Sequence, residues 1–208
     1  MQPSYPVSFS VDYPERELNR LSTFFRIFAV IPIAIVASLL PGSEIAASTT
    51  SNSVGGSVAG GSIVFAPIVL MLLFRKVYPR WWYDWNLELL RFGNRIGVYV
   101  LLMDDEYPST EKQQAVHLDF AYPDAEQLQR GMPLVKWLLA IPHYIVLFFL
   151  YIGVFFAVIW AWLVILFTGR YPRSVFKFIE GTIRWHNRVL GYAFALVTDD
   201  YPPFRLSA

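Results

Sequence analysis

The chain contains no cysteine and is poor in charged residues. Because Cys is absent, disulfides, thiolate nucleophiles and cysteine-held iron–sulfur clusters are excluded. Charged residues make up 16% of the 208 positions, against about 25% in an average soluble domain. The formal net charge is only +1, so no basic surplus is present to bind nucleic acid. With 55% hydrophobic residues and a mean hydropathy of +0.42, the composition predicts a membrane protein.

Three long apolar runs divide the sequence. A transmembrane helix needs about 20 apolar residues, and the first two runs are close to that length. The third run, 133–167, is too long for one crossing and predicts two helices joined by a tight turn near Tyr151–Gly153. Four transmembrane helices are therefore expected, over residues 23–40, 58–74, 133–150 and 153–167.

The positive charges are expected to lie on one side of these helices. The linker 41–61 between the first two helices contains no Lys or Arg, and neither does the predicted turn. Lys and Arg accumulate in the cytoplasmic loops of membrane proteins, which predicts a multi-pass protein of the inner membrane with both termini cytoplasmic. The first fifteen residues hold no Lys or Arg, so they do not fit a cleaved signal peptide and are expected to be retained.

Short motifs recur in the two halves of the chain, which indicates an internal duplication. The offset between a motif in the first half and its match in the second half is smaller after the predicted hairpin than before it. The difference is close to the length of the linker 41–61, which indicates that the second half lacks that loop. The sequence thus predicts two parallel tandem repeats, 1–110 and 111–208, related by an axis along the membrane normal. The matched pairs are Tyr13-Pro14 with Tyr122-Pro123, Arg26 with Lys136, Pro32 with Pro142, Tyr78-Pro79 with Tyr171-Pro172, Arg91–Arg95 with Arg184–Arg188, and Asp105–Pro108 with Asp199–Pro202.

Each predicted hairpin is flanked by a second kind of element. Residues 80–100 and 173–196 place charged side chains on one helical face and Trp, Phe, Leu or Ile on the other. This pattern is typical of amphipathic helices that lie in the membrane interface. Ahead of each hairpin, apolar and polar residues alternate over 7–11 and 116–120, which favours short cytoplasmic strands that pair the repeats. The expected class is an all-α membrane protein with a small β element.

The most specific polar motif is a repeated Arg-x-x-Asn-Arg, whose arginines lie one helical turn apart and share a face. It is either a solvated face weakly attracted to anionic lipid or a site that holds a lipid phosphate or the acidic turns 104–106 and 199–200. Two further cations, Arg26 and Lys136, lie at matching depth and are expected to extend to the headgroups as boundary anchors. The candidate headgroup-binding residues are Arg91, Asn94, Arg95, Arg184, Asn187 and Arg188.

The three histidines are not spaced as metal ligands. His143 lies in an apolar run, where it is either a packing residue or an axial ligand to a haem or chlorin. No nucleophile elbow, phosphate loop, zinc-protease or dinucleotide motif occurs in the sequence. We therefore expect no catalytic residues, no metal and no cofactor, and we expect that the protein is not an enzyme.

Several segments resemble a known family: YPVSFSVDYPE, LLAIPHYIVLFFL, LFTGRYPRSVFKFIEGTIRW and TDDYPPFRL. They are similar to the bacterial membrane family catalogued as domain of unknown function 4389, and the likeness is closest in the second half. The first half has Val30-Ile-Pro-Ile33 where the second has Ala140-Ile-Pro-His143, so the histidine is not duplicated. The resemblance implies a membrane topology and brings no catalytic residues.

Two functions remain open from the sequence. The absence of acidic residues within the expected spans favours a scaffold or accessory subunit of a membrane complex over an ion pump. The alternative is a lipid-binding or small-solute transport module with a site at the repeat interface. Membrane lipids and other membrane-protein subunits are the expected partners.

Overall fold

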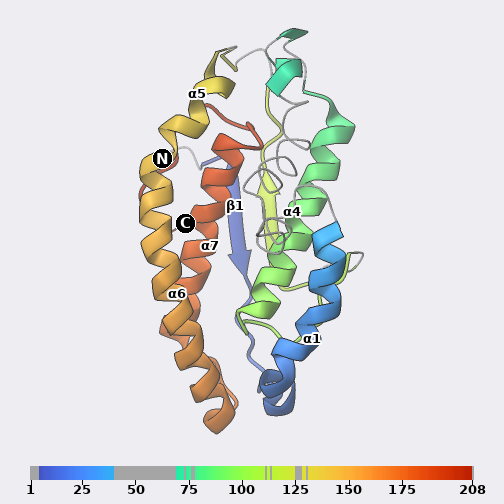
Figure 1. Cartoon of the computed structure of the whole chain (residues 1–208), viewed down its shortest axis with the longest axis vertical. Coiled ribbons are helices and arrows are strands. Elements are labelled where there is room, and N and C mark those ends of the chain that lie inside the picture. Colours follow the sequence, from blue (N-terminus) through green and yellow to red (C-terminus); the bar gives the residue numbers. More distant parts are fainter. Residues whose placement is uncertain are drawn as a thin grey trace, which may run out of the picture.

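A computed structural model describes residues 5–39, 69–72, 74–75, 78–110, 112, 114–124, 128–129 and 131–207. The expected second span, 58–74, lies mostly outside these residues. The described part is mostly helical and contains one small sheet. Figure 1 shows the sheet in the middle of an elongated molecule, with the helices running along its length.

The two strands pair across the two halves of the chain. Strand β1, Val7–Val11, runs antiparallel to β2, Val116–Phe120, with Val7 opposite Phe120 and Val11 opposite Val116. In each strand every second residue is buried, because successive side chains point to opposite faces. The alternating pattern in the sequence thus predicted both strands and their pairing.

The two amphipathic segments form helices that pack against this sheet. Helix α4, Arg80–Val100, contacts β2, and helix α7, Arg173–Ala193, contacts β1. Both helices begin directly after the proline of a Tyr-Pro pair in an extended conformation, because proline suits the start of a helix but not its interior. The predicted helices are confirmed, although α7 ends three residues earlier than expected.

After α4 and α7 the chain bends back in the same way. Leu102 has φ 64° and Leu196 has φ 55°, in the left-handed region that a leucine rarely adopts. Both side chains are buried in the core, so their packing offsets the backbone strain. These bends position the acidic segments that follow each helix.

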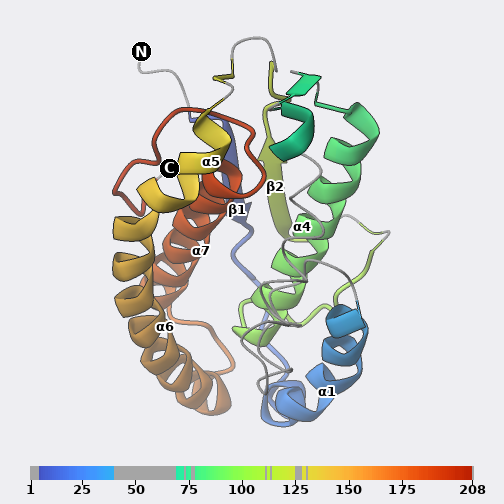
Figure 2. The same ribbon diagram turned by 45° about the horizontal axis from the view of Figure 1, so that its top comes forward.

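Helix α1, Arg20–Leu39, confirms the helix expected over the first apolar run. It packs against α4 and against the far part of the longest helix, α6, Ile141–Thr168. Phe24 of α1 stacks on Trp162 of α6, with ring centroids 6.4 Å apart. The start of α1 and the far part of α6 therefore meet at one end of the molecule (Figure 2).

The turn predicted near Tyr151–Gly153 is wrong, because α6 passes through these residues without a break. A single glycine does not end a helix, and the one polar side chain of 151–153, that of Tyr151, lies against His186 and does not bond the backbone groups that a turn would free. Gly153 instead allows close helix packing: a Cβ there would lie 3.2 Å from the Phe178 ring. The break comes earlier, at Ala140, where helix α5, Met132–Leu139, ends and α6 begins at Ile141 with Pro142 in its first turn.

This correction also changes the charge distribution. Lys136 and Arg170, which the sequence analysis placed at one membrane face, lie near opposite ends of α6. At about 1.5 Å per residue, the 28 residues of α6 span about 42 Å. The single cationic side expected from the sequence therefore does not apply to this helix.

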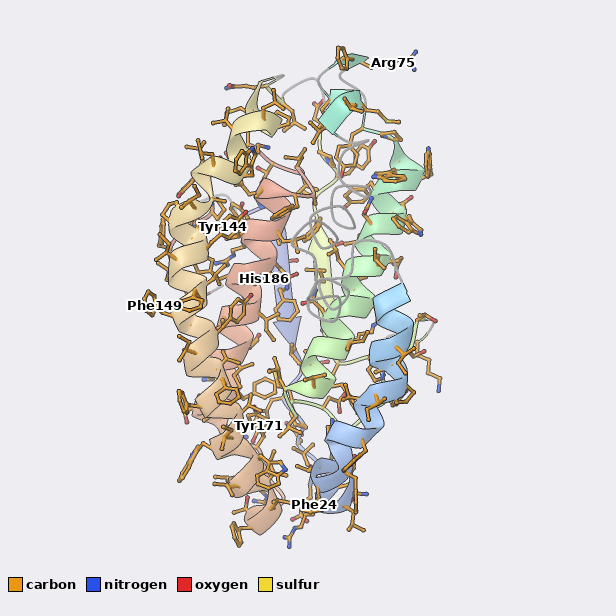
Figure 3. The ribbon with its side chains drawn as sticks, in the orientation of Figure 1. Phe24, Arg75, Tyr144, Phe149, Tyr171 and His186 are labelled. Atoms are coloured by element: carbon orange, nitrogen blue, oxygen red, sulfur yellow. The ribbon has the colours of Figure 1, made fainter. Side chains whose placement is uncertain are left out.

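Within the part of the chain that the structure describes, one helical stretch is long and apolar enough to cross a membrane. It covers Met132–Thr168, that is α5 and α6 together, and contains an 18-residue window with a mean hydropathy of 2.6. Large side chains cover its outer face: Phe149 is 65% exposed and Phe167 79% exposed. In Figure 3, Phe149 points away from the rest of the molecule.

Candidate functional site

Arg26 lies inside the protein, where α1 meets the end of α4. Its side chain is 3% exposed and forms an ion pair with Asp105. It also donates to the backbone oxygen of Tyr99 at 3.0 Å, and its guanidinium lies 4.2 Å from the centre of that ring. A buried cation needs such partners, because an isolated charge is expensive to desolvate.

Lys136 makes the matching set of contacts in the second half. It is 1% exposed, and its Nζ lies 2.6 Å from Asp199 Oδ1 and donates to Thr198 O at 2.6 Å. The ammonium lies 5.3 Å from the centre of the Tyr192 ring. Each half of the chain thus buries one cation between an aspartate and a tyrosine.

The two aspartates also tie down matched backbone positions. Asn19 N donates to Asp105 Oδ2 at 2.6 Å, and Gln129 N donates to Asp199 Oδ2 at 2.9 Å. Each carboxylate therefore fixes the segment that leads into its apolar helix. The acidic turns are bound in this way by Arg26 and Lys136, and not by the Arg-x-x-Asn-Arg motif.

Sequence reasoning missed these ion pairs. It expected Arg26 and Lys136 to extend to headgroups, because neither apolar run contains an acid, but both are buried inside the protein. The acids come from the segments after α4 and α7, which fold back along the helices. The recurrence of an acidic Tyr-Pro segment, at Asp105 and at Asp199, was the available signal.

Two asparagines of the repeated motif bind each other between α4 and α7. Asn94 Nδ2 donates to Asn187 Oδ1 at 3.0 Å, and Asn187 Nδ2 donates to Asn94 Oδ1 at 2.7 Å. Each amide also donates to a carbonyl four residues earlier on its own helix. This exchange closes the middle of the interface between the two halves.

The first arginine of each motif reaches the strand of the other half. Arg91 Nε donates to Leu118 O at 2.8 Å. Arg184 Nε donates to Phe9 O, also at 2.8 Å. Each guanidinium also pairs with a glutamate on its own helix. These arginines therefore fasten α4 and α7 to the sheet.

The second arginine of each motif is buried and bonded to backbone oxygens. Arg95 donates to Ser109 O at 2.7 Å, and Arg188 donates to Arg205 O at 3.2 Å and Ser207 O at 3.0 Å. Burial, together with the nearby Arg205 and Arg184 guanidiniums, lowers the pKa of Arg188. All six candidate headgroup residues thus make contacts within the protein, and lipid binding by them stays a prediction.

Four tyrosines of the Tyr-Pro pairs join the two halves. Tyr13 donates its hydroxyl to Tyr171 O, and Tyr122 donates to Tyr78 O. In turn, Tyr78 donates to Ala195 O at 2.8 Å and Tyr171 to Leu101 O at 3.1 Å. Burial raises the pKa of both Tyr78 and Tyr171. The sequence analysis used these pairs only as matched motifs of the two halves.

His143 is fully buried in an aromatic cluster. Its Nδ1 accepts a hydrogen bond from Trp185 Nε1 at 3.0 Å, and its ring stacks on Phe204 with centroids 4.0 Å apart. A neutral imidazole that accepts at Nδ1 carries its proton on Nε2, so in this state it has no lone pair for a metal. The contacts suit a packing residue, and haem or chlorin ligation stays untested.

A groove between α6 and α7, which the sequence did not predict, has a volume of about 400 Å³. We call it the α6–α7 groove. Tyr151 and His186 face each other at its wall, with Tyr151 Oη 2.7 Å from His186 Nδ1. Figure 3 shows Tyr144 and His186 on the facing sides of the two helices. The lining residues are Tyr144, Leu147, Phe148, Tyr151, His186, Val189, Leu190 and Phe194.

Among the described residues, no group of three or more His, Asp or Glu side chains is arranged to hold a metal ion. The carboxylates of Asp105 and Asp199 are already paired with buried cations. These polar side chains therefore form internal ion pairs and hydrogen bonds to the backbone.

The similarity to known proteins lies in the second half of the chain. The family model described as Domain of unknown function (DUF4389) matches residues 132–205, from α5 to the segment after α7. The resemblance that the sequence motifs indicated is confirmed over this stretch. No curated protein and no solved structure matches the chain significantly.

Proposed function

We propose that the chain is an integral membrane protein that serves as a scaffold or accessory subunit of a membrane complex. The observation that carries this proposal is the outer face of α6, where large apolar side chains such as Phe149, Phe155 and Phe156 are more than half exposed. A water-soluble monomer rarely presents so continuous an apolar surface. Hydrocarbon or a partner protein would cover it.

The interior supports a structural role. The buried cations are bonded to aspartates or to backbone oxygens, and the central asparagines bond each other. Groups held in this way stabilise one arrangement of the helices, whereas catalysis needs a polar group directed at a substrate. The alternative, a transport or lipid site at the repeat interface, is less favoured because Asn94 and Asn187 occupy that interface.

We also propose that the chain consists of two tandem repeats. Matched positions have matched contacts: Arg26 and Lys136 each bind the aspartate of an acidic Tyr-Pro segment, and Arg91 and Arg184 each donate to a strand of the other half. A duplicated chain with a twofold relation would produce such pairs. Duplication would also explain why the sheet of the described residues takes one strand from each half.

Multi-pass insertion with both termini on the cytoplasmic side is part of this proposal. Tyr5 donates its hydroxyl to Asp200 O at 3.2 Å, so the two ends of the described chain lie together. Figure 2 shows the start of β1 beside the end of α7. This contact supports termini on the same side of the membrane.

Single-cysteine labelling tests the membrane placement. Because the chain has no native cysteine, only the introduced thiol can react. We expect Phe155→Cys to resist a water-soluble maleimide in membranes and to react after denaturation. Ser207→Cys, at an exposed position, should react with the same maleimide once the vesicles are opened and the reagent reaches the cytoplasmic side. Equal labelling of both variants in membranes, with the protein released by alkaline extraction, would contradict the proposal.

The subunit role needs a separate measurement. Extracted in a mild detergent, the 23.9 kDa chain should migrate in an assembly that contains a second polypeptide at fixed stoichiometry. Denaturing detergent should dissolve that assembly and serves as the control. A chain that is monomeric in every mild detergent would refute the scaffold or subunit role and leave the membrane placement standing.

A further inference from the structure

The α6–α7 groove opens on the apolar face of α6. Phe148, which forms its rim, is 63% exposed and belongs to the row of outward-facing aromatics. Leu147, Val189 and Leu190 line it and are buried. The groove is therefore continuous with the surface that the proposed function places in hydrocarbon, and its volume of about 400 Å³ lies within the usual range of ligand pockets.

The polar atoms in the wall do not favour a charged ligand. No lining residue is Lys, Arg, Asp or Glu. The Tyr151 hydroxyl and His186 Nδ1 lie 2.7 Å apart and bond each other, so this pair is satisfied without water or a phosphate. A phosphate headgroup would need cationic or N–H donors at the wall. The groove instead presents the chemistry of a hydrocarbon chain.

Among the residues that the structure describes, α4 lacks the side chains that form the α7 wall of this groove. The positions that match His186 and Leu190 are Gly93 and Gly97, and a Cβ added at either glycine would meet nothing within 4 Å. The wall side chains at His186 and Leu190 thus have no match on α4.

We infer that the α6–α7 groove binds one acyl chain of a membrane lipid, held by its tail and not by its headgroup. This inference rests on the proposed membrane function. It differs from the headgroup binding expected for the Arg-x-x-Asn-Arg motif, because the contacts are apolar and lie on the opposite side of α7 from Arg184 and Arg188, which bond the strand and the C-terminal segment.

Photo-crosslinking tests the inference directly. The intact chain is reconstituted in phosphatidylethanolamine–phosphatidylglycerol vesicles that contain a trace of phosphatidylglycerol with a diazirine in the middle of one acyl chain. After irradiation, peptide mapping should place adducts on groove residues such as Tyr144 and Leu190 and also on the outer face at Phe155. A probe with the diazirine in its headgroup should leave the groove unmodified.

A groove-filling variant provides the matched comparison. Leu190→Trp should reduce the groove adduct about tenfold relative to the Phe155 adduct, because the indole occupies the space of the chain. Phe156→Trp, which adds the same side chain on the outer face, should leave the groove adduct unchanged. His186→Trp, at a half-buried position of the wall, provides a second filling variant in case Leu190→Trp fails to fold.

The outcomes separate the two proposals. Outer-face adducts without groove adducts in the wild-type chain would overturn the acyl-chain site and leave the membrane placement intact. A groove adduct that the folded filling variants do not reduce, or one that forms with the headgroup probe, would also overturn the site. If no residue of α6 is modified, the proposed membrane function fails together with the inference.

Discussion

Asn94 and Asn187 exchange two side-chain hydrogen bonds, of 3.0 and 2.7 Å, across the interface between α4 and α7. They occupy the same position in the two copies of Arg-x-x-Asn-Arg. A residue that contacts its own counterpart lies on the axis that relates two copies. This contact locates the axis that the proposed duplication requires, and it gives the motif a structural role.

The asparagine pair should show strong energetic coupling. Asn94→Ala leaves the fully buried Asn187 amide without its side-chain partner, which should lower the free energy of unfolding by about 1–3 kcal/mol. Adding Asn187→Ala should then cost less than that substitution costs alone. Chemical unfolding in a mild detergent, followed by circular dichroism, measures the cycle. Additive losses would show that the two amides act independently.

The buried ion pair of Lys136 and Asp199 should matter more than an exposed one. Asp199→Asn leaves the ammonium buried without a charged partner and should destabilise the protein by about 3–5 kcal/mol. The control is Asp119→Asn, which breaks the pair with Arg91 at a carboxylate that is 73% exposed. That change should cost about 0–1 kcal/mol. Similar losses in the two variants would contradict the structural role of Lys136.

Two glycines within helices should respond oppositely to alanine. Gly97→Ala adds a Cβ to open space on α4 and should stabilise the helix by about 0.5–1 kcal/mol. In Gly191→Ala the new Cβ would lie 2.7 Å from Val7 Cγ2, so α7 and β1 must separate, at a cost of about 1–3 kcal/mol. Thermal unfolding of both variants compares them. Stabilisation by Gly191→Ala would contradict the close contact of α7 with the sheet.

Stability should fall at alkaline pH because of buried tyrosines. Burial, the main cause, raises the pKa of Tyr83 to about 12, and burial also raises the pKa values of Tyr78 and Tyr171. An unfolded tyrosine releases its proton near pH 10, so above that pH the unfolded state binds fewer protons than the folded state and the free energy of unfolding decreases. These groups contribute their full stabilisation below pH 10 and lose it between pH 10 and their folded pKa values.

Unfolding curves from pH 8 to 12, with tyrosinate absorbance recorded in parallel, measure this effect. Tyr78→Phe should make the alkaline loss shallower, while Tyr107→Phe, at a half-exposed ring, should leave its slope unchanged. Stability that stays constant up to pH 12 in the wild-type chain would refute the role assigned to the buried hydroxyls.

The sequence predicted those elements whose signal is local. The alternation at Val7–Val11 and Val116–Phe120 predicted the strands, and the amphipathic pattern after each Tyr-Pro pair predicted α4 and α7. The buried faces of the two strands follow directly from the period of their side chains. Their pairing across the two halves followed from the recurrence of the motifs.

The sequence did not predict features that depend on distant contacts. The length of the run 133–167 suggested a turn, but Gly153 packs against Phe178 of α7, and a local reading does not show this neighbour. The partner of Arg26, Asp105, lies 79 positions away and outside every apolar run. The groove likewise depends on how α6 lies along α7, which neither helix specifies alone.

The central claim is that the outer face of α6 lies in hydrocarbon, and spin-label accessibility tests it most directly. Nitroxides attached singly at Phe149→Cys and Phe156→Cys, in chains reconstituted into lipid vesicles, should collide readily with oxygen and little with a water-soluble nickel chelate. A nitroxide at Asp12→Cys, an exposed position, should show the reverse. Nickel accessibility at Phe149 and Phe156 as high as at Asp12 would contradict the account.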